Sequence, residues 1–243
     1  MDQLTAALTI KTIEESATTG VFEIEGLYAG YGLTISNALR RTLLSSLSGA
    51  AVTQIKIKGA THEFTTLPGL KEDLVELSLN FKKLRFKIHT DEPQVLALQA
   101  KGEGVVTGEA IKTNAQVELV NPGEVLGHLT TKSAELSVEL TVERGRGYVP
   151  TNVRHPREKL PVGAIAIDAL YSPVVSVNVT IEDMRVGDRT DYNRVRLEVI
   201  TDGTISPSTA MQQSAALLRE HFEIVAGLEV KNDFPEAKKS AKK

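Results

Sequence analysis

The sequence predicts an α+β protein in which an antiparallel-sheet domain is interrupted by an inserted, mostly β domain. Alternating apolar and polar residues dominate the chain, as is typical of antiparallel strands with one covered face and one wet face. Strongly amphipathic helical patterns occur near both ends of the 243 residues. We therefore expect residues 1–49 and 173–231 to form one discontinuous domain with two amphipathic helices, and residues 50–172 to form the insertion. Residues 232–243 lose all periodicity and predict a disordered tail or the start of a linker.

The first helix is predicted within Gly30–Val52. Gly30 and Gly32 precede it, and Gly49 stands where a left-handed C-cap would fall. At helical spacing, one broad stripe is suited to burial. The stripe consists of Ile35, Ala38, Leu39, Thr42, Leu43, Ser46 and Leu47.

The opposite face of this helix mixes cationic and apolar side chains. It carries Arg40 and Arg41, and Leu44 lies one turn after Arg41. Two interpretations stay open. This face is either ordinary solvated surface, or it is covered by a partner, since the planar guanidinium of arginine suits interface cores.

The middle of the chain is mostly strand and loop. A second, short helix is predicted after Pro68, in the segment "GLKEDLVELSLNF", where Leu70, Leu74, Leu77 and Phe81 recur at helical spacing. Strands are predicted where the alternation is clearest. These segments are "VFEIE", "VTQIKIK", "AELSVELTVE", "VVSVNVTIE" and "RVRLEVI".

The last helix has a clear start signal. Ser206 is placed as the N-cap and Pro207 suits the first helical position. Its apolar residues recur at spacings of four and three, which is typical of a helix packed nearly in line with another, although an ordinary core helix is the alternative. Two amphipathic helices offer more apolar surface than one modest sheet can cover, so we predict a two-fold symmetric homodimer. The predicted dimer interface is Ile35, Leu39, Leu43, Leu47, Met211, Leu218, Phe222 and Val225.

The residues argue against an independent enzyme. There is no cysteine, and His62, His89, His128, His155 and His221 are scattered singly, without metal-ligand spacing. No phosphate-binding loop, nucleophile elbow or acid/base pair is recognisable. We expect no catalytic residue, cofactor or metal in this chain. The N-terminus lacks a signal-peptide pattern and no apolar run approaches about 20 residues, so we expect a cytoplasmic protein without a membrane partner.

One basic cluster stands out. It is a proline-containing loop with Arg144, Arg146, Arg154, His155, Arg157 and Lys159. The loop is either solvated or a contact for nucleic acid or an acidic partner. The formal net charge of −3 argues against broad binding of nucleic acid. A nucleic-acid-binding module that uses residues 144–159 stays open as the alternative function because of this loop. A stand-alone hydrolase is a more distant alternative.

Several long motifs along the chain together carry a resemblance to one protein family. The first helix reads "GYGLTISNALRRTLLSS", and Gly49 to Lys82 reads "GAAVTQIKIKGATHEFTTLPGLKEDLVELSLNFK". Further on, "RGRGYVP", "DALYSPV", "RTD" and "TDGTISPSTA" follow in the family's order. These motifs resemble those of the bacterial RNA polymerase α subunit family. The resemblance runs from about Val21 to about Leu228, and its several long motifs make it specific.

The resemblance implies a scaffold within DNA-directed RNA polymerase, a nucleotidyltransferase whose catalytic residues lie on another subunit. In the family, the first and last helices form an α–α dimer interface that nucleates assembly of the β and β′ subunits, with omega and sigma in the holoenzyme. Arg41 and Leu44 match the family's β-binding positions, and Lys82 and Asp168 match positions that face β or β′. Little direct DNA binding is expected.

The chain departs from the family pattern at three points. Ser36 stands where glycine is usual, and Ser48 stands where proline is usual. The family normally continues through a linker into a small helical DNA-binding domain, whereas the sequence given ends at "AKKSAKK". Either the chain is truncated or its lineage lacks that domain, so contacts with upstream promoter DNA and activators do not carry over.

Overall fold

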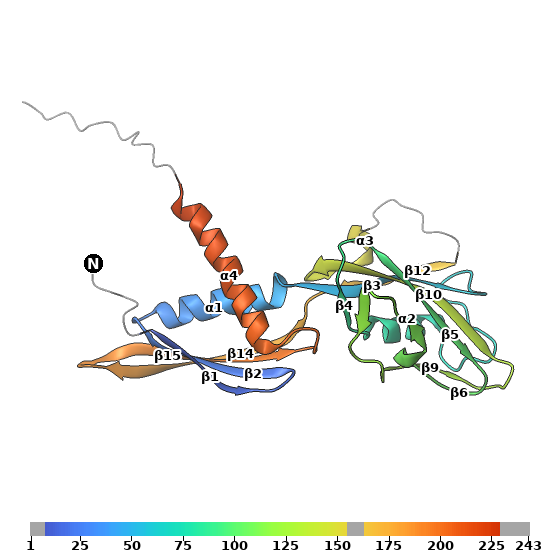
Figure 1. Cartoon of the computed structure of the whole chain (residues 1–243), viewed down its shortest axis with the longest axis horizontal. Coiled ribbons are helices and arrows are strands. Elements are labelled where there is room, and N and C mark those ends of the chain that lie inside the picture. The colour runs from blue at the N-terminus through green and yellow to red at the C-terminus, as the bar shows by residue number, and fades with distance from the viewer. Residues whose placement is uncertain (1–7, 155–162, 229–243) are drawn as a thin grey trace, which may run out of the picture.

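The computed structural model describes residues 8–154 and 163–228, which form two lobes joined by a narrow junction (Figure 1). The terminal lobe comprises residues 8–47 and 173–228, and the central lobe comprises residues 48–154 and 163–172. Both lobes contain antiparallel sheets and few helices, which confirms the predicted α+β class. None of the described helices is long and apolar enough to cross a membrane.

The terminal lobe is a four-stranded sheet covered on one face by two helices. The strand order is β1-β2-β15-β14, with every pair antiparallel. Its elements are β1 (Thr9–Glu15), β2 (Thr19–Leu27), α1 (Tyr31–Ser45), β14 (Val174–Val186), β15 (Arg189–Thr201) and α4 (Pro207–Ala226).

The central lobe is built around a seven-stranded sheet with the order β7-β5-β10-β3-β4-β8, and β12 pairs with β3 beside this path. Two small two-stranded sheets, β11-β13 and β6-β9, and three short helices complete it. The elements are β3 (Ser48–Ile57), α2 (Leu74–Lys82), β4 (Phe86–Ile88), β5 (Gln94–Lys101), β6 (Gly104–Thr107), η1 (Gly108–Ala110), β7 (Ile111–Lys112), β8 (Val117–Leu119), β9 (Val125–Leu129), β10 (Glu135–Arg146), β11 (Tyr148–Val149), α3 (Thr151–Arg154), β12 (Ala164–Ala166) and β13 (Ala169–Leu170).

Each lobe has its own hydrophobic core. The central core lies between the seven-stranded sheet and α2, where Leu74, Leu77 and Phe81 are fully buried. The terminal core lies between the four-stranded sheet, α1 and α4. That each lobe is an independent domain, divided at residues 49/50 and 172/173, stays a prediction.

The predicted start signals of α1 and α4 are confirmed at Gly30 and Ser206. Gly30 caps α1 with a φ of 85°, a left-handed conformation that glycine adopts without a Cβ clash. The Ser206 hydroxyl accepts a hydrogen bond from Thr209 N at 3.2 Å and Pro207 begins α4.

The predicted C-cap at Gly49 is wrong. Helix α1 ends at Ser45, with Ser46 as its C-cap, and Gly49 lies in strand β3. A Cβ on Gly49 would stand 1.9 Å from the carbonyl oxygen of Tyr171, so the glycine permits a close backbone crossing at the junction of the lobes.

The second helix is shorter than its sequence pattern. Helix α2 begins at Leu74, because the Asp73 carboxylate accepts a hydrogen bond from Glu76 N at 2.7 Å and caps the helix there. Leu70 lies outside α2 but packs against the same core.

Candidate subunit interfaces

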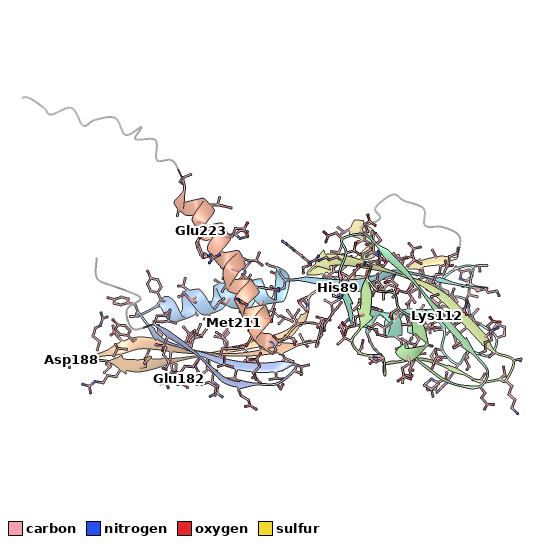
Figure 2. The ribbon with its side chains drawn as sticks, in the orientation of Figure 1. His89, Lys112, Glu182, Asp188, Met211 and Glu223 are labelled. Carbon is pink, nitrogen blue, oxygen red and sulfur yellow. The ribbon has the colours of Figure 1, made fainter. Side chains whose placement is uncertain are left out.

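Helix α4 divides into a packed half and a free half. Its first turns pack on α1 and the sheet, and Ala210, Met211 and Ser214 are buried. Its second half projects away from both lobes (Figures 1 and 2). There the side chains of Phe222 and Val225 are 64% and 68% exposed. Exposed apolar side chains at helical spacing indicate a surface that a partner covers.

The predicted dimer residues fall into three groups. Leu39, Leu43, Leu47 and Met211 are buried inside the single chain, because their stripe faces the chain's own sheet. Ile35 and Leu218 are half-buried, and Phe222 and Val225 are exposed. A contact of any of these residues with a second copy stays a prediction.

Other exposed apolar residues lie near these helices and were missed in the sequence. Leu33 on α1 is 60% exposed, and Ile10 on β1 is 63% exposed. Ile10 pairs in register with Ile24, whose side chain is in the core under α1. Ile10 therefore lies on the helix-covered face of the sheet, where neither α1 nor α4 of the same chain hides it.

Arg41 and Leu44 lie in the last turns of α1, at the end of the helix that leads into the junction. Arg41 is exposed, and no described carboxylate pairs with its guanidinium. Leu44 is half-buried against the terminal core, and its carbonyl oxygen accepts a hydrogen bond from Ser172 Oγ at 3.0 Å. The pair thus presents a free cation beside a partly covered apolar side chain.

Lys82 and Asp168 are distant in sequence and adjacent in space. The Lys82 Nζ lies 3.6 Å from Asp168 Oδ2, and it also lies 5.2 Å from the centroid of the Tyr148 ring. The Tyr148 hydroxyl donates to Asp168 Oδ2 at 2.8 Å. Thr151 donates its backbone N–H and its hydroxyl to Asp168 Oδ1, each at 2.9 Å.

This cluster holds Asp168 as a carboxylate. The Thr151 backbone N–H, then the Tyr148 hydroxyl, Thr151 Oγ1 and Lys82, lower the pKa of Asp168 to about 2 against a smaller effect of burial. The hydrogen bond to this carboxylate in turn raises the pKa of Tyr148. At neutral pH Asp168 is therefore a carboxylate, held in place by its contacts with Lys82, Tyr148 and Thr151.

Tyr148 and Thr151 are functional candidates that the sequence analysis did not single out. Tyr148 lies within the "RGRGYVP" motif, which was the available signal. On α2, Leu79 is 54% exposed and lies one turn before Lys82. The surface around Lys82 and Asp168 is therefore charged at its centre with exposed apolar and aromatic groups beside it.

The described cations of the basic loop differ in their surroundings. Arg154 turns inward, and its guanidinium donates to the carbonyl oxygens of Thr53 at 2.6 Å and Ile167 at 2.9 Å. Arg144 pairs with Asp91 at 2.9 Å. His155, Arg157 and Lys159 lie outside the described residues. The described part of the loop thus does not favour the nucleic-acid alternative.

The described residues hold no candidate metal centre. In residues 8–154 and 163–228, no three histidine or acidic side chains gather as a metal site would require. The closest described pair of a histidine and a carboxylate is His128 and Glu72, with 2.5 Å between Nδ1 and Oε1. Burial alone would raise the pKa of Glu72, but the hydrogen bonds from His128 outweigh burial and hold this pKa below its usual value. The Glu72 carboxylate is thus a structural partner of the histidine.

The comparisons with known proteins agree on one family. The family model of the RNA polymerase Rpb3/RpoA insert domain matches residues 55–172. The chain is 48% identical over 209 residues to the DNA-directed RNA polymerase subunit alpha of Moorella thermoacetica, covering 86% of this chain and 66% of the relative. It is 47% identical over 219 residues to that of Carboxydothermus hydrogenoformans, covering 90% and 69%. It is also 47% identical over 216 residues to that of Symbiobacterium thermophilum, covering 89% and 68%.

The chain spans about two thirds of the length of these relatives. The matched region includes the central lobe and most of the terminal lobe, and the identity is well above the level at which relatives share a fold. The chain therefore belongs to the family of DNA-directed RNA polymerase alpha subunits.

Proposed function

We propose that the chain is a homodimeric, non-catalytic scaffold on which the β and β′ subunits of a cytoplasmic RNA polymerase assemble. The observation that carries the proposal is the free half of α4, where Phe222, Ile224 and Val225 are largely exposed, as is Leu228 just after the helix. A helix of this length gains most of its stability from a packed apolar face, and a second copy supplies that face symmetrically.

The geometry supports reciprocal packing of the two helices. Leu33 on α1 and Ile10 on the helix-covered face of the sheet remain exposed, because the free half of α4 does not cover them. A partner's α4 has the apolar surface needed to cover them. We expect a total interface on the order of 2,000 Å² or more, because obligate homodimers bury areas of this size.

Two surfaces are available to the large subunits. One is the cation–leucine pair of Arg41 and Leu44, and the other is the Lys82–Asp168 cluster with Tyr148. The first contains an arginine and the second a tyrosine, two residue types that are enriched among interface hot spots. Because a dimer carries two copies of each surface, one chain can meet β and the other β′.

Co-purification with β and β′ tests the proposal. The tagged chain is co-expressed with both large subunits, isolated, and analysed for bound subunits and for its own mass by sedimentation. We expect a dimer that retains β and β′. A chain that sediments as a stable monomer at micromolar concentration, or a dimer that captures neither subunit, would contradict it.

A further inference from the structure

The polypeptide crosses between the lobes only twice within the described residues, near residues 48–50 and 171–174. Beside these crossings lies a cavity of about 240 Å³. It is lined from the central lobe by Phe86 and His89 and from the terminal lobe by Thr204 and Gln213. Side chains do not fill this space, so apolar packing alone does not hold the lobes at one angle here.

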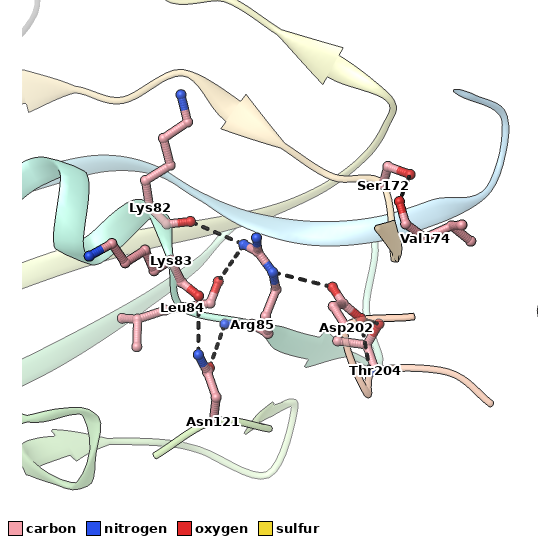
Figure 3. Close-up of polar contacts among 9 residues, drawn as sticks. All are labelled: Lys82, Lys83, Leu84, Arg85, Asn121, Ser172, Val174, Asp202 and Thr204. Carbon is pink, nitrogen blue, oxygen red and sulfur yellow. Dashed lines mark hydrogen bonds and ion pairs between the residues drawn. The ribbon is translucent and has the colours of Figure 1, made fainter. Parts of the chain in front are cut away.

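In the central lobe, Arg85 is anchored to the end of α2 (Figure 3). Its guanidinium donates to the carbonyl oxygens of Lys82 at 3.1 Å and Leu84 at 3.3 Å. Its backbone N–H donates to Asn121 Oδ1 at 2.7 Å, and Asn121 Nδ2 donates to Lys83 O at 3.1 Å. These contacts fix the position of Arg85 within the central lobe.

On the terminal side, Asp202 occupies the turn between β15 and α4. Its Oδ1 accepts from Thr204 N at 3.0 Å and from Thr204 Oγ1 at 2.6 Å. Its backbone N–H donates to Pro173 O at 3.0 Å. These bonds leave Oδ2 directed at the central lobe, where Arg85 Nε lies 3.4 Å away (Figure 3).

This ion pair is shielded from water. The side chains of Arg85 and Asp202 are 22% and 9% exposed, whereas most ion pairs of the described chain are far more exposed. Solvent and salt therefore screen the attraction between them less than they screen surface pairs.

We propose that Arg85 and Asp202 are positioning residues that set the angle between the lobes, and with it the angle between the two docking surfaces. Lys82 is the last residue of α2, and its carbonyl oxygen accepts a hydrogen bond from the Arg85 guanidinium. The Lys82–Asp168 cluster therefore moves with Arg85. Arg41 and Leu44 lie on α1 in the other lobe. A partner that touches both surfaces binds more weakly when their relative orientation must first be ordered. The link to subunit capture rests on the proposed function.

The interlobe angle can be measured directly. Because the chain has no cysteine, spin labels can be placed at Lys112→Cys in the central lobe and Thr180→Cys in the terminal lobe. Labelled chain is diluted into excess unlabelled chain, so that double electron–electron resonance reports distances within one chain. Asp202→Asn keeps an oxygen for Thr204 but places an amide beside Arg85. We expect it, and Arg85→Ala, to broaden the distance distribution.

Glu139→Gln is the matched control, because the pair of Glu139 and Lys56 at 3.9 Å lies within the central lobe and is exposed. The same variants are tested for capture of β and β′. We expect capture by Asp202→Asn to weaken about tenfold, the scale of one charge-assisted contact, and that of Glu139→Gln to stay unchanged.

The outcomes separate the two proposals. Distance distributions of Asp202→Asn and Arg85→Ala as narrow as that of the unsubstituted labelled chain would overturn the positioning role. So would a broadened distribution with undiminished capture. Failure of the unsubstituted chain to capture either subunit would overturn the proposed function, while the distances would still decide the interlobe contact. Thermal melting identifies a variant that unfolds, and Arg85→Gln, which removes the charge but keeps a polar side chain, then replaces Arg85→Ala.

Discussion

Truncation of Phe222 to alanine should weaken dimerisation strongly without changing the fold of the single chain. Phe222 is 64% exposed, and with about 200 Å² of surface on a phenylalanine, about 130 Å² would be buried by a second copy. At about 25 cal/mol per Å², this area corresponds to about 3 kcal/mol per chain. Two-fold symmetry uses the residue twice, so about 6 kcal/mol per dimer is an upper limit.

Half of that limit corresponds to an increase of roughly 100-fold in the dimer dissociation constant. Sedimentation equilibrium over a concentration series measures this constant. Phe64→Ala is the matched control, since Phe64 is 75% exposed but lies in the central lobe, away from α4. Its truncation should leave the constant unchanged.

The reasoning would be refuted if Phe222→Ala and Phe64→Ala dimerised with the same constant as the unsubstituted chain. At concentrations where the chains are monomeric, both variants should melt within a few degrees of it, because exposed substitutions usually change stability by less than about 0.5 kcal/mol. A large loss of melting temperature in Phe222→Ala under conditions where the protein is monomeric would instead place this residue in the chain's own core.

Arg41→Ala should melt like the unsubstituted chain and remain dimeric but lose capture of β in a pull-down. Arg41→Lys should rescue capture only in part, because an ammonium cannot reproduce a planar fork. A drop in melting temperature with capture intact would contradict this. Leu43→Asp should fail to give a folded chain by circular dichroism, because Leu43 is fully buried and a carboxylate there would lack a partner; a folded monomer would show that the terminal core tolerates the charge. Since the folded-state pKa of Asp168 is depressed to about 2, its contribution to stability should be present above about pH 4 and be lost as the pH falls toward 2. Urea unfolding between pH 5 and pH 2 should therefore show a flatter pH dependence for Asp168→Asn, and identical slopes would count against it. With a net charge of −3, the chain should bind duplex DNA with a dissociation constant of roughly 10⁻⁴ M or weaker at physiological salt; submicromolar, salt-sensitive binding by fluorescence anisotropy would disagree.

Local patterns in the sequence were sufficient for the class of the fold, for the long strands and for the start of α4. Alternation along "AELSVELTVE" predicts strand β10, and Ser206 with Pro207 predicts the start of α4, because hydrophobic period and helix capping act within a few residues. The motifs from Gly30 onward were also sufficient for the family, since they depend on residue identity rather than on contacts.

Contacts between distant residues required the tertiary structure. The role of Gly49 depends on Tyr171, which lies more than a hundred positions away and approaches it only after the lobes have formed. The cations of the basic loop look alike in sequence, but Arg154 turns inward because the carbonyl oxygens of Thr53 and Ile167 converge there. No local pattern encodes such a convergence.

The two helices show the same division. The spacing of Leu39, Leu43, Phe222 and Val225 marks all four as apolar-face residues, but spacing does not say what covers that face. The chain's own sheet covers the first two, and the last two extend beyond its edge. Helical period is a property of the local chain, whereas burial depends on how far the sheet reaches under each helix, so only the tertiary structure decides which residues remain for a partner.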